Sequence, residues 1–158
     1  MPLPISATEP ALVGSLELVF TLNAPRDRVW KAIVDETARW WRADFFVGSR
    51  AKAMLFEAQV GGRFWEDWGN GEGVLWGTVV LVDAPRAFDL SCVITAAYGG
   101  PRHSMLHVEL EEKNGVTTLR LTDSMHGRIE GNLLENLAAG WTMLFGESLT
   151  KYVEGKKV

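Results

Sequence analysis

Two adjacent carboxylates, Glu66 and Asp67, lie between two tryptophans, Trp65 and Trp68. A carboxyl group that aromatic neighbours shield from water can serve as a general acid or base. Alternatively, one carboxylate faces solvent and its neighbour pairs with a cation such as Arg63, and we favour this interpretation. We assign no catalytic residue; Asp67 and Glu66 are the best candidates if the chain is an enzyme.

Three histidines, His103, His107 and His126, are the next candidates, because imidazole and carboxylate ligands together bind zinc. No ligand-spacing motif accompanies them. Alternation along the strand places His107 on the face opposite Leu106, toward solvent. We therefore predict surface histidines and no metal site.

Other common chemical motifs are missing. Ser104, Ser124 and Ser148 lack the Gly-x-Ser-x-Gly pattern of a nucleophile elbow. The glycine-rich segment 69–73 lacks the Lys-Ser/Thr pair of a phosphate-binding loop and predicts a hairpin turn instead. Cys92 is the single cysteine, which excludes an intrachain disulfide and a cysteine-based metal cluster. We expect no cofactor.

Large apolar side chains are the remaining signal, since the chain contains seven tryptophans. Such side chains either fill a core or line a ligand-binding cavity, and the sequence supports the two interpretations equally. The predicted ligand-binding residues are Trp41, Phe56, Trp65, Trp76, Met105, Trp141, Met143 and Phe145.

The elements that must position these residues are mostly strands. Alternating apolar and polar residues and turn signals such as Asn114-Gly115 mark them. The predicted strands are 16–23, 54–60, 63–68, 74–83, 88–95, 104–113 and 117–123. After the first strand, Pro25 opens an amphipathic helix, and a second short helix carries Trp40 and Trp41. Short turns between consecutive strands imply an antiparallel sheet.

One long helix is predicted over residues 132–154, with an apolar face that needs cover. Its predicted caps are Asn132 with Glu135 at the start and Gly155 at the end. Gly140 and Gly146 each cost about 1 kcal/mol inside a helix relative to alanine. A close approach of the helix to the sheet can offset that cost.

Composition and charge narrow the function classes. The 158 residues are 47% hydrophobic and 23% charged, with a net charge of −4 and no long basic stripe, so we expect no nucleic acid partner. Residues 1–14 have no basic start and no unbroken apolar run, which predicts a flexible arm rather than a signal peptide or membrane span. We expect a single domain over residues 15–158 in a cytoplasmic protein, as a monomer or homodimer.

These elements predict an α+β architecture in which a seven-stranded curved antiparallel sheet wraps around the long C-terminal helix. Two short helices follow the first strand. A sheet that grips a long helix often leaves a cavity between them, which favours a binding function over catalysis.

The order of elements and several short motifs resemble the START-like, helix-grip (birch-pollen-allergen-like) superfamily, and within it the homologues of the heat-shock-protein ATPase activator. The resemblance covers residues 15–154. The residues that carry it are Ala24-Pro25, Val29-Trp30, Asp35-Glu36, Trp40, Gly61-Gly62-Arg63-Phe64, Gly77-Thr78-Val79, Pro85, Gly140-Trp141, Leu149 and Tyr152-Val153-Glu154. It implies the fold, whereas members of the superfamily bind lipids, hormones and polyketides, contact chaperones, or act as cyclases and hydrolases.

Three functions follow as hypotheses. The first is binding of a small apolar or amphipathic molecule in a cavity between the sheet and the helix. The second, which rests on the resemblance alone, is a protein-binding factor that contacts a heat-shock chaperone. The third is a cyclase or hydrolase that uses Asp67 or Glu66.

Overall fold

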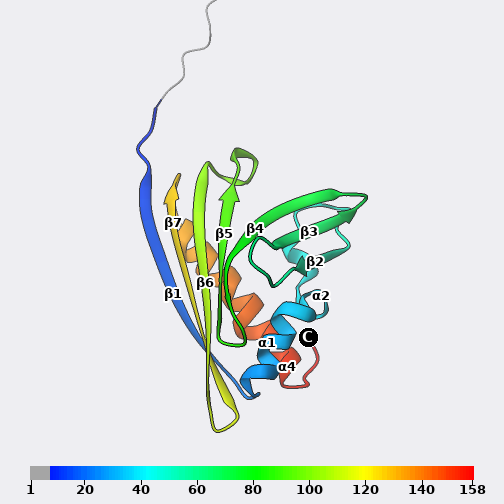
Figure 1. Ribbon diagram of the computed structural model, residues 1–158. Coiled ribbons are helices and arrows are strands. Elements are labelled where there is room, and N and C mark those ends of the chain that lie inside the picture. Colours follow the sequence, from blue (N-terminus) through cyan, green and yellow to red (C-terminus); the bar gives the residue numbers. More distant parts are fainter. Residues whose placement is uncertain (1–7) are drawn as a thin grey trace, which may run out of the picture.

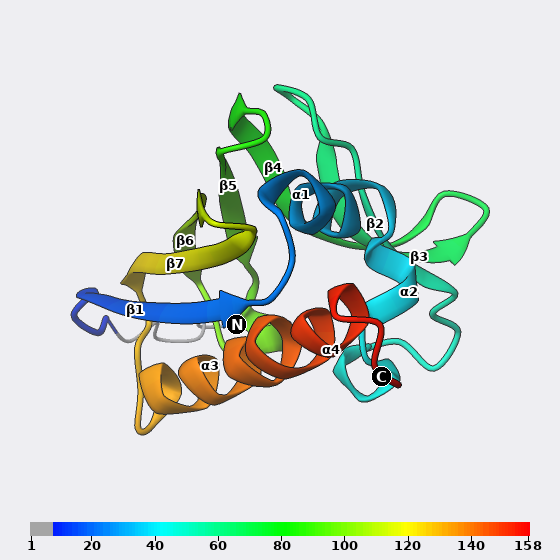
Figure 2. The same cartoon turned by 90° about the horizontal axis from the view of Figure 1, so that it is seen from below.

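The computed structural model describes residues 8–158 and confirms the α+β helix-grip architecture. Seven antiparallel strands form one sheet in the order β1-β7-β6-β5-β4-β3-β2. The sheet curves, and the C-terminal helix crosses its concave side (Figures 1 and 2). The strands are β1 (Leu12–Leu22), β2 (Ala53–Phe56), β3 (Arg63–Gly69), β4 (Glu72–Asp83), β5 (Ala87–Ile94), β6 (Arg102–Lys113) and β7 (Val116–Gly127).

The helices lie in three places along the chain. The helices α1 (Arg26–Asp35) and α2 (Thr37–Trp40) and the short turn η1 (Ala43–Phe45) connect β1 to β2, and the turn η2 (Ala96–Tyr98) precedes β6. A continuous C-terminal helix comprises α3 (Leu133–Trp141), the π-helical segment η3 (Thr142–Leu149) and α4 (Thr150–Val153). Seen from below, α1 and α2 lie beside its C-terminal part (Figure 2).

The observed ends of β1, β6 and β7 differ from those predicted from the sequence. The first strand begins at Leu12, so the last three residues of the predicted arm 1–14 belong to the sheet; residues 1–7 of that arm lie outside the described part of the chain. β6 begins two residues before the predicted Ser104, and β7 continues to Gly127, beyond the predicted end at Asp123. The two strands pair along their whole length, from Arg102 opposite Gly127 to Lys113 opposite Val116.

Turns and bulges produce the curvature of the sheet. Asn70 and Asn114 have φ of 56° and 54° and are each followed by a glycine with positive φ, as the tight turns predicted at these two hairpins require. Register shifts between β3 and β4 and within the β4–β5 pair mark β-bulges, which bend strands and increase their twist.

The ends of the C-terminal helix differ in how they are capped. Asn132 precedes the first turn but its side chain makes no capping hydrogen bond, so the predicted capping box is absent. At the other end Gly155 has φ of 70°, and the amides of Gly155 and Lys156 donate to the carbonyl oxygens of Tyr152 and Lys151. This is the Schellman arrangement that the glycine predicts.

Gly146 explains how the helix reaches the sheet. A methyl group at this position would lie 2.7 Å from Cε1 of Phe20 on β1. The helix backbone therefore approaches the sheet closely here, as predicted. The nearest neighbour of Gly140 is instead Phe45 of η1, whose Cε1 would be 3.3 Å from such a methyl group.

The core lies between the concave face of the sheet, α1, α2 and the second half of the C-terminal helix. Its fully buried members include Leu22, Val29, Trp40, Leu121 and Leu149. Within residues 8–158, no helix has the length and apolar character needed to cross a bilayer.

Candidate functional site

A cavity of about 460 Å³ lies between the concave face of the sheet and the first half of the C-terminal helix. This volume is within the range of small-molecule sites. The residues that line it are Trp41, Phe45, Val47, Met54, Phe64, Trp76, Leu90, Cys92, Ile94, Tyr98, Arg102, Ser104, Leu106, Asp123, Met125, Leu133, Asn136, Leu137, Gly140, Trp141 and Leu144.

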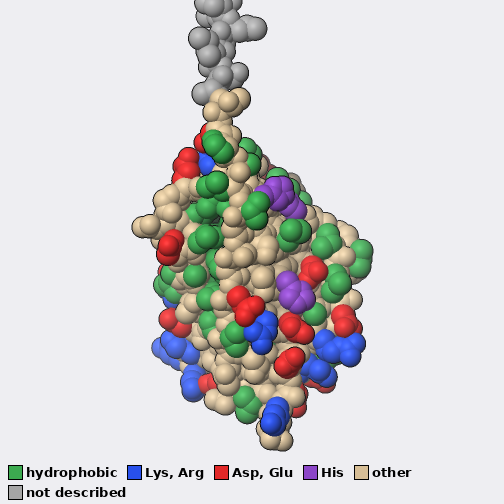
Figure 3. All heavy atoms as spheres, turned by 90° about the vertical axis from the view of Figure 1, so that its left-hand side faces the viewer, with side chains coloured by type: hydrophobic (Ala, Val, Ile, Leu, Met, Phe, Trp, Pro, Cys, Tyr) green, Lys and Arg blue, Asp and Glu red, His purple; other side chains and the backbone are tan. Residues whose placement is uncertain are grey.

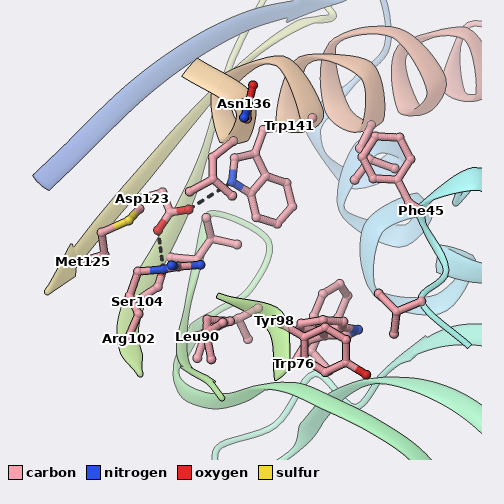
Figure 4. A pocket seen from close by; sticks show the side chains of 18 of the residues that line it. Phe45, Trp76, Leu90, Tyr98, Arg102, Ser104, Asp123, Met125, Asn136 and Trp141 are labelled. Carbon is pink, nitrogen blue, oxygen red and sulfur yellow. Dashed lines mark hydrogen bonds between the residues drawn. The ribbon is translucent and has the colours of Figure 1, made fainter. Parts of the chain in front are cut away.

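Most of the cavity wall is apolar and aromatic. The tilted rings of Trp76 on β4 and Tyr98 on η2 are in contact, with centroids 5.2 Å apart, on the side of the cavity away from Asp123 (Figure 4). Val47 and Tyr98 line the cavity and are 46% and 40% exposed, so the cavity wall extends to the surface of the molecule. The cavity can therefore admit an apolar molecule from solvent.

One end of the cavity is polar. The Asp123 side chain on β7 is 3% exposed and accepts two hydrogen bonds, one from the hydroxyl of Ser104 and one from Nε1 of Trp141 at 3.1 Å. Figure 4 shows this carboxylate between the helix and β6. Ser104 and Asp123 face inward because they continue the inward rows of Leu106 and Leu121 on their strands.

Arg102 adds a positive charge beside this carboxylate. It is 8% exposed, and its Nη1 donates to the carbonyl oxygens of Arg128 and Gly99 at 3.2 and 3.4 Å. Burial lowers the pKa of Arg102, and the charge of Asp123 partly counters that effect. Asn136 of α3 brings an amide to the same cavity. The polar end thus offers donors and acceptors to a ligand.

Cys92 of β5 also lines the cavity and is the free thiol of the chain. Burial, and to a smaller extent the charge of Asp123, raise the pKa of its thiol to about 12. The thiol is therefore protonated at neutral pH and contributes apolar surface rather than a nucleophile.

Three of the eight predicted ligand-binding residues line the cavity, and two others border a smaller void beside it. Trp41, Trp76 and Trp141 line it directly. Phe56 and Phe145 instead border a separate void of only about 10 Å³ in the adjoining core, where Trp141 also lies. The ring of Phe145 packs edge-to-face against Trp40 and at a tilt against Trp141, with centroids 5.4 and 5.8 Å apart.

The other three predicted residues border neither the cavity nor this void. Trp65 alternates with the inward Phe64 and Glu66, and its ring stacks on the guanidinium of Arg63, 4.0 Å away. Met105 is 52% exposed because it alternates with the inward Ser104 and Leu106. Met143 lies on the C-terminal helix but is not among the residues that line the cavity.

The two candidate carboxylates, Glu66 and Asp67, do not line the cavity either. Glu66 is fully buried and accepts hydrogen bonds from the amides of Val47 and Gly48 at 3.1 and 2.8 Å and from Nε1 of Trp68 at 2.9 Å. It thereby fixes the loop before β2. Asp67 accepts a hydrogen bond from the amide of Gly69 at 3.0 Å and stabilises the turn after β3.

The histidines lie on the convex face of the sheet. His103 and His126 face each other across β6 and β7 with ring centroids 5.3 Å apart, and His107 pairs with Asp89. Figure 3 shows histidines on this side among mixed hydrophobic and charged side chains. In residues 8–158, no group of three His, Cys, Asp or Glu side chains has a metal-binding arrangement.

Comparison with known proteins places this geometry in a family. The model of the family described as "Activator of Hsp90 ATPase homolog 1-like protein" matches residues 23–154. No curated protein sequence matches the chain.

Solved structures share the fold at low identity. The Mll3558 protein from Rhizobium loti is 20% identical, with a TM-score of 0.66 over 87% of this chain and 96% of that chain. PFC0360w, an HSP90 activator from Plasmodium falciparum, is 22% identical, with a TM-score of 0.62 over 90% and 97%. The Aha1 dimer from Colwellia psychrerythraea is 16% identical, with a TM-score of 0.62 over 92% and 99%.

The family match covers most of the chain, and the sheet gripping a C-terminal helix agrees with it. The chain therefore belongs to the family of activator of Hsp90 ATPase homolog 1-like proteins, within the START-like superfamily.

Proposed function

We propose that the chain binds a small, mainly apolar ligand in the cavity between the sheet and the first half of the C-terminal helix. The observation that carries the proposal is the cavity of about 460 Å³, whose wall is aromatic and aliphatic except at one polar end. A few polar groups converging in an otherwise apolar pocket are typical of sites that bind and orient small molecules.

Rings from separate elements support this proposal. Trp141 comes from the C-terminal helix, Trp76 from β4 and Trp41 from the end of α2. Large rings held by a rigid sheet and helix provide contact area without ordering a loop on binding. A ligand seated among them is expected to quench or shift tryptophan fluorescence.

A cavity-filling variant tests the proposal. In Gly140→Phe, a phenyl group would enter the cavity, since Gly140 lines it and only Phe45 lies within 4 Å of the position of a Cβ atom. Ala139→Phe, one residue earlier and exposed, is the matched control. Native mass spectrometry and fluorescence titration against a panel of apolar molecules should detect binding by the parent and Ala139→Phe, with at least about tenfold weaker binding by Gly140→Phe.

The proposal fails if no member of the panel binds the parent protein, or if a folded Gly140→Phe binds as well as Ala139→Phe. Circular dichroism of each variant establishes that the fold persists.

A second candidate function is an accessory factor for a heat-shock chaperone. The observation that favours it is the family match over residues 23–154, together with the fold shared with an HSP90 activator from Plasmodium falciparum. The test is the ATP hydrolysis rate of the Hsp90-type chaperone from the same cell, with and without this chain, alongside a pull-down. A higher rate with direct contact supports the role, and an unchanged rate without contact rejects it.

A further inference from the structure

The least satisfied charge in the cavity is the guanidinium of Arg102. The side chain is 8% exposed, yet its hydrogen bonds go only to the carbonyl oxygens of Gly99 and Arg128. Within residues 8–158, no carboxylate lies within ion-pair distance of it. A buried cation without an anionic partner is unfavourable, so an anion that reaches it should be bound strongly.

Free donors remain on this guanidinium. Arginine has five N–H groups, and Nη1 alone makes the contacts described above. Among residues 8–158, the buried side-chain nitrogens that lack a partner are Nε of Arg26 and Nε1 of Trp41. Nε and Nη2 of Arg102 are not among them, which indicates that they reach open space. Arg102 also lines the cavity, so a ligand bound there can approach these donors.

Asp123 does not occupy these donors. Its two oxygens accept hydrogen bonds from Ser104 and Trp141, which hold the carboxylate in a fixed orientation (Figure 4). It attracts the guanidinium at a distance but forms no ion pair with it. The same charge repels every anion near Arg102, and it repels a ligand with two negative charges more strongly than a ligand with one.

From this geometry we infer that the cavity selects an amphipathic monocarboxylic acid, with its carboxylate on Arg102 and its apolar body among Trp76, Tyr98 and Trp141. The inference rests on the proposed function, because it specifies the ligand class of the same cavity. Carboxylate and guanidinium form paired, charge-assisted hydrogen bonds. An apolar chain or ring then covers the aromatic wall.

The test compares an acid with its alcohol. Isothermal titration calorimetry at neutral pH measures decanoate and decanol binding to the parent chain, to Arg102→Gln and to Arg102→Lys. Arg120→Gln is the matched control, because Arg120 pairs with Glu17 on the outer face of the sheet. The parent should bind decanoate about 10- to 100-fold more tightly than decanol, as a charged hydrogen-bonded pair predicts.

In Arg102→Gln this preference should disappear through weaker decanoate binding, while decanol affinity stays within about threefold of the parent. Arg102→Lys should keep part of the preference, and Arg120→Gln all of it. Equal affinities in the parent, or a preference that survives in Arg102→Gln, overturn the inference and leave the cavity function standing. If the parent binds neither probe, the inference fails, and the panel of apolar molecules described above decides the cavity function separately. If Arg102→Gln does not fold, the parent and Arg102→Lys still decide the outcome.

Discussion

The two halves of the C-terminal helix meet different surroundings. In α3, from Leu133 to Trp141, no side chain is fully buried, and several side chains border the cavity. In the π-helical segment that follows, Leu144, Phe145, Ser148 and Leu149 are all buried. The first half of this continuous helix thus lines the cavity, and its second half packs into the core.

The short helices account for this difference. The hydroxyl of Ser148 donates to the carbonyl oxygen of Trp40, and the rings of Phe145 and Trp40 pack edge-to-face with centroids 5.4 Å apart, so α2 packs against the second half. Tyr152 donates to Glu36, between α1 and α2, at 2.8 Å. No residue of α1 or α2 lines the cavity, whereas Trp41, which directly follows α2, does. The position of α1 and α2 therefore determines which half of the C-terminal helix is packed into the core and which half borders a cavity.

Matched leucine truncations should give the largest contrast between the halves. Leu149 is 0% exposed, so Leu149→Ala should lower the free energy of unfolding by about 3 kcal/mol. Leu137 borders the open cavity, so Leu137→Ala should lower it by only about 1 kcal/mol. Urea unfolding measures both values. Equal losses would show that the first half is as tightly packed as the second.

Two serine hydroxyls sharpen the comparison for polar groups. Ser148→Ala leaves the carbonyl oxygen of Trp40 without its donor in a dry core, which should cost about 2 kcal/mol. Ser104→Ala removes a donor from Asp123, but water entering the cavity can replace it, so the loss should stay below about 1 kcal/mol. Thermal unfolding of both variants checks the order, and a larger loss for Ser104→Ala would contradict a hydrated cavity.

Replacing glycine with alanine should have opposite effects on stability at positions 146 and 140. Gly146→Ala brings a methyl group within 2.7 Å of Phe20, which must shift, and should destabilise the chain by about 1–2 kcal/mol. Gly140→Ala meets Phe45 at 3.3 Å beside open space, so a small displacement suffices. The better helix propensity of alanine should then stabilise the chain by up to about 1 kcal/mol. Chemical denaturation reports both signs, and destabilisation in both variants would refute the contrast.

The fold could be predicted largely from local signals. Asn-Gly turns and alternating strands identified the antiparallel sheet, and an apolar periodicity identified the long helix. These features depend on residues close together in the sequence, so they can be predicted without knowing the tertiary structure. The π-helical geometry of 142–149 was not predicted, and the close neighbour of Gly140 is Phe45 rather than the sheet.

The polar end of the cavity was missed although a signal for it exists. Extending the inward row of Leu106 back along β6 reaches Ser104 and Arg102, and extending that of Leu121 along β7 reaches Asp123. The same rule places Met105 outside. Choosing candidate ligand-binding residues by side-chain type instead of strand face therefore included outward residues and omitted inward polar ones. The cavity itself depends on how separate elements pack, which alternation within one strand does not determine.

The smallest predicted effect concerns the ionic contact that joins α4 to the short helices. Burial acts to raise the pKa of Glu36, but hydrogen bonds from Tyr152 and Arg28 outweigh it, so the pKa lies below its ordinary value. Because the folded state favours the ionised form, the contact stabilises the fold above the ordinary glutamate pKa of about 4.3. The stabilisation is lost as pH falls through the lower folded-state value.

Glu36→Gln should therefore reduce the free energy of unfolding by about 1 kcal/mol at neutral pH, and the difference from the parent should shrink toward zero in acid. Glu147→Gln, at an exposed position of the C-terminal helix, is the control and should change the free energy of unfolding less than Glu36→Gln does at neutral pH. Denaturant unfolding from neutral to acidic pH measures both. If Glu36→Gln lowered the free energy of unfolding by the same amount at every pH, the charge of Glu36 would not be the cause. Packing between α4 and the short helices would then stabilise the second half of the C-terminal helix.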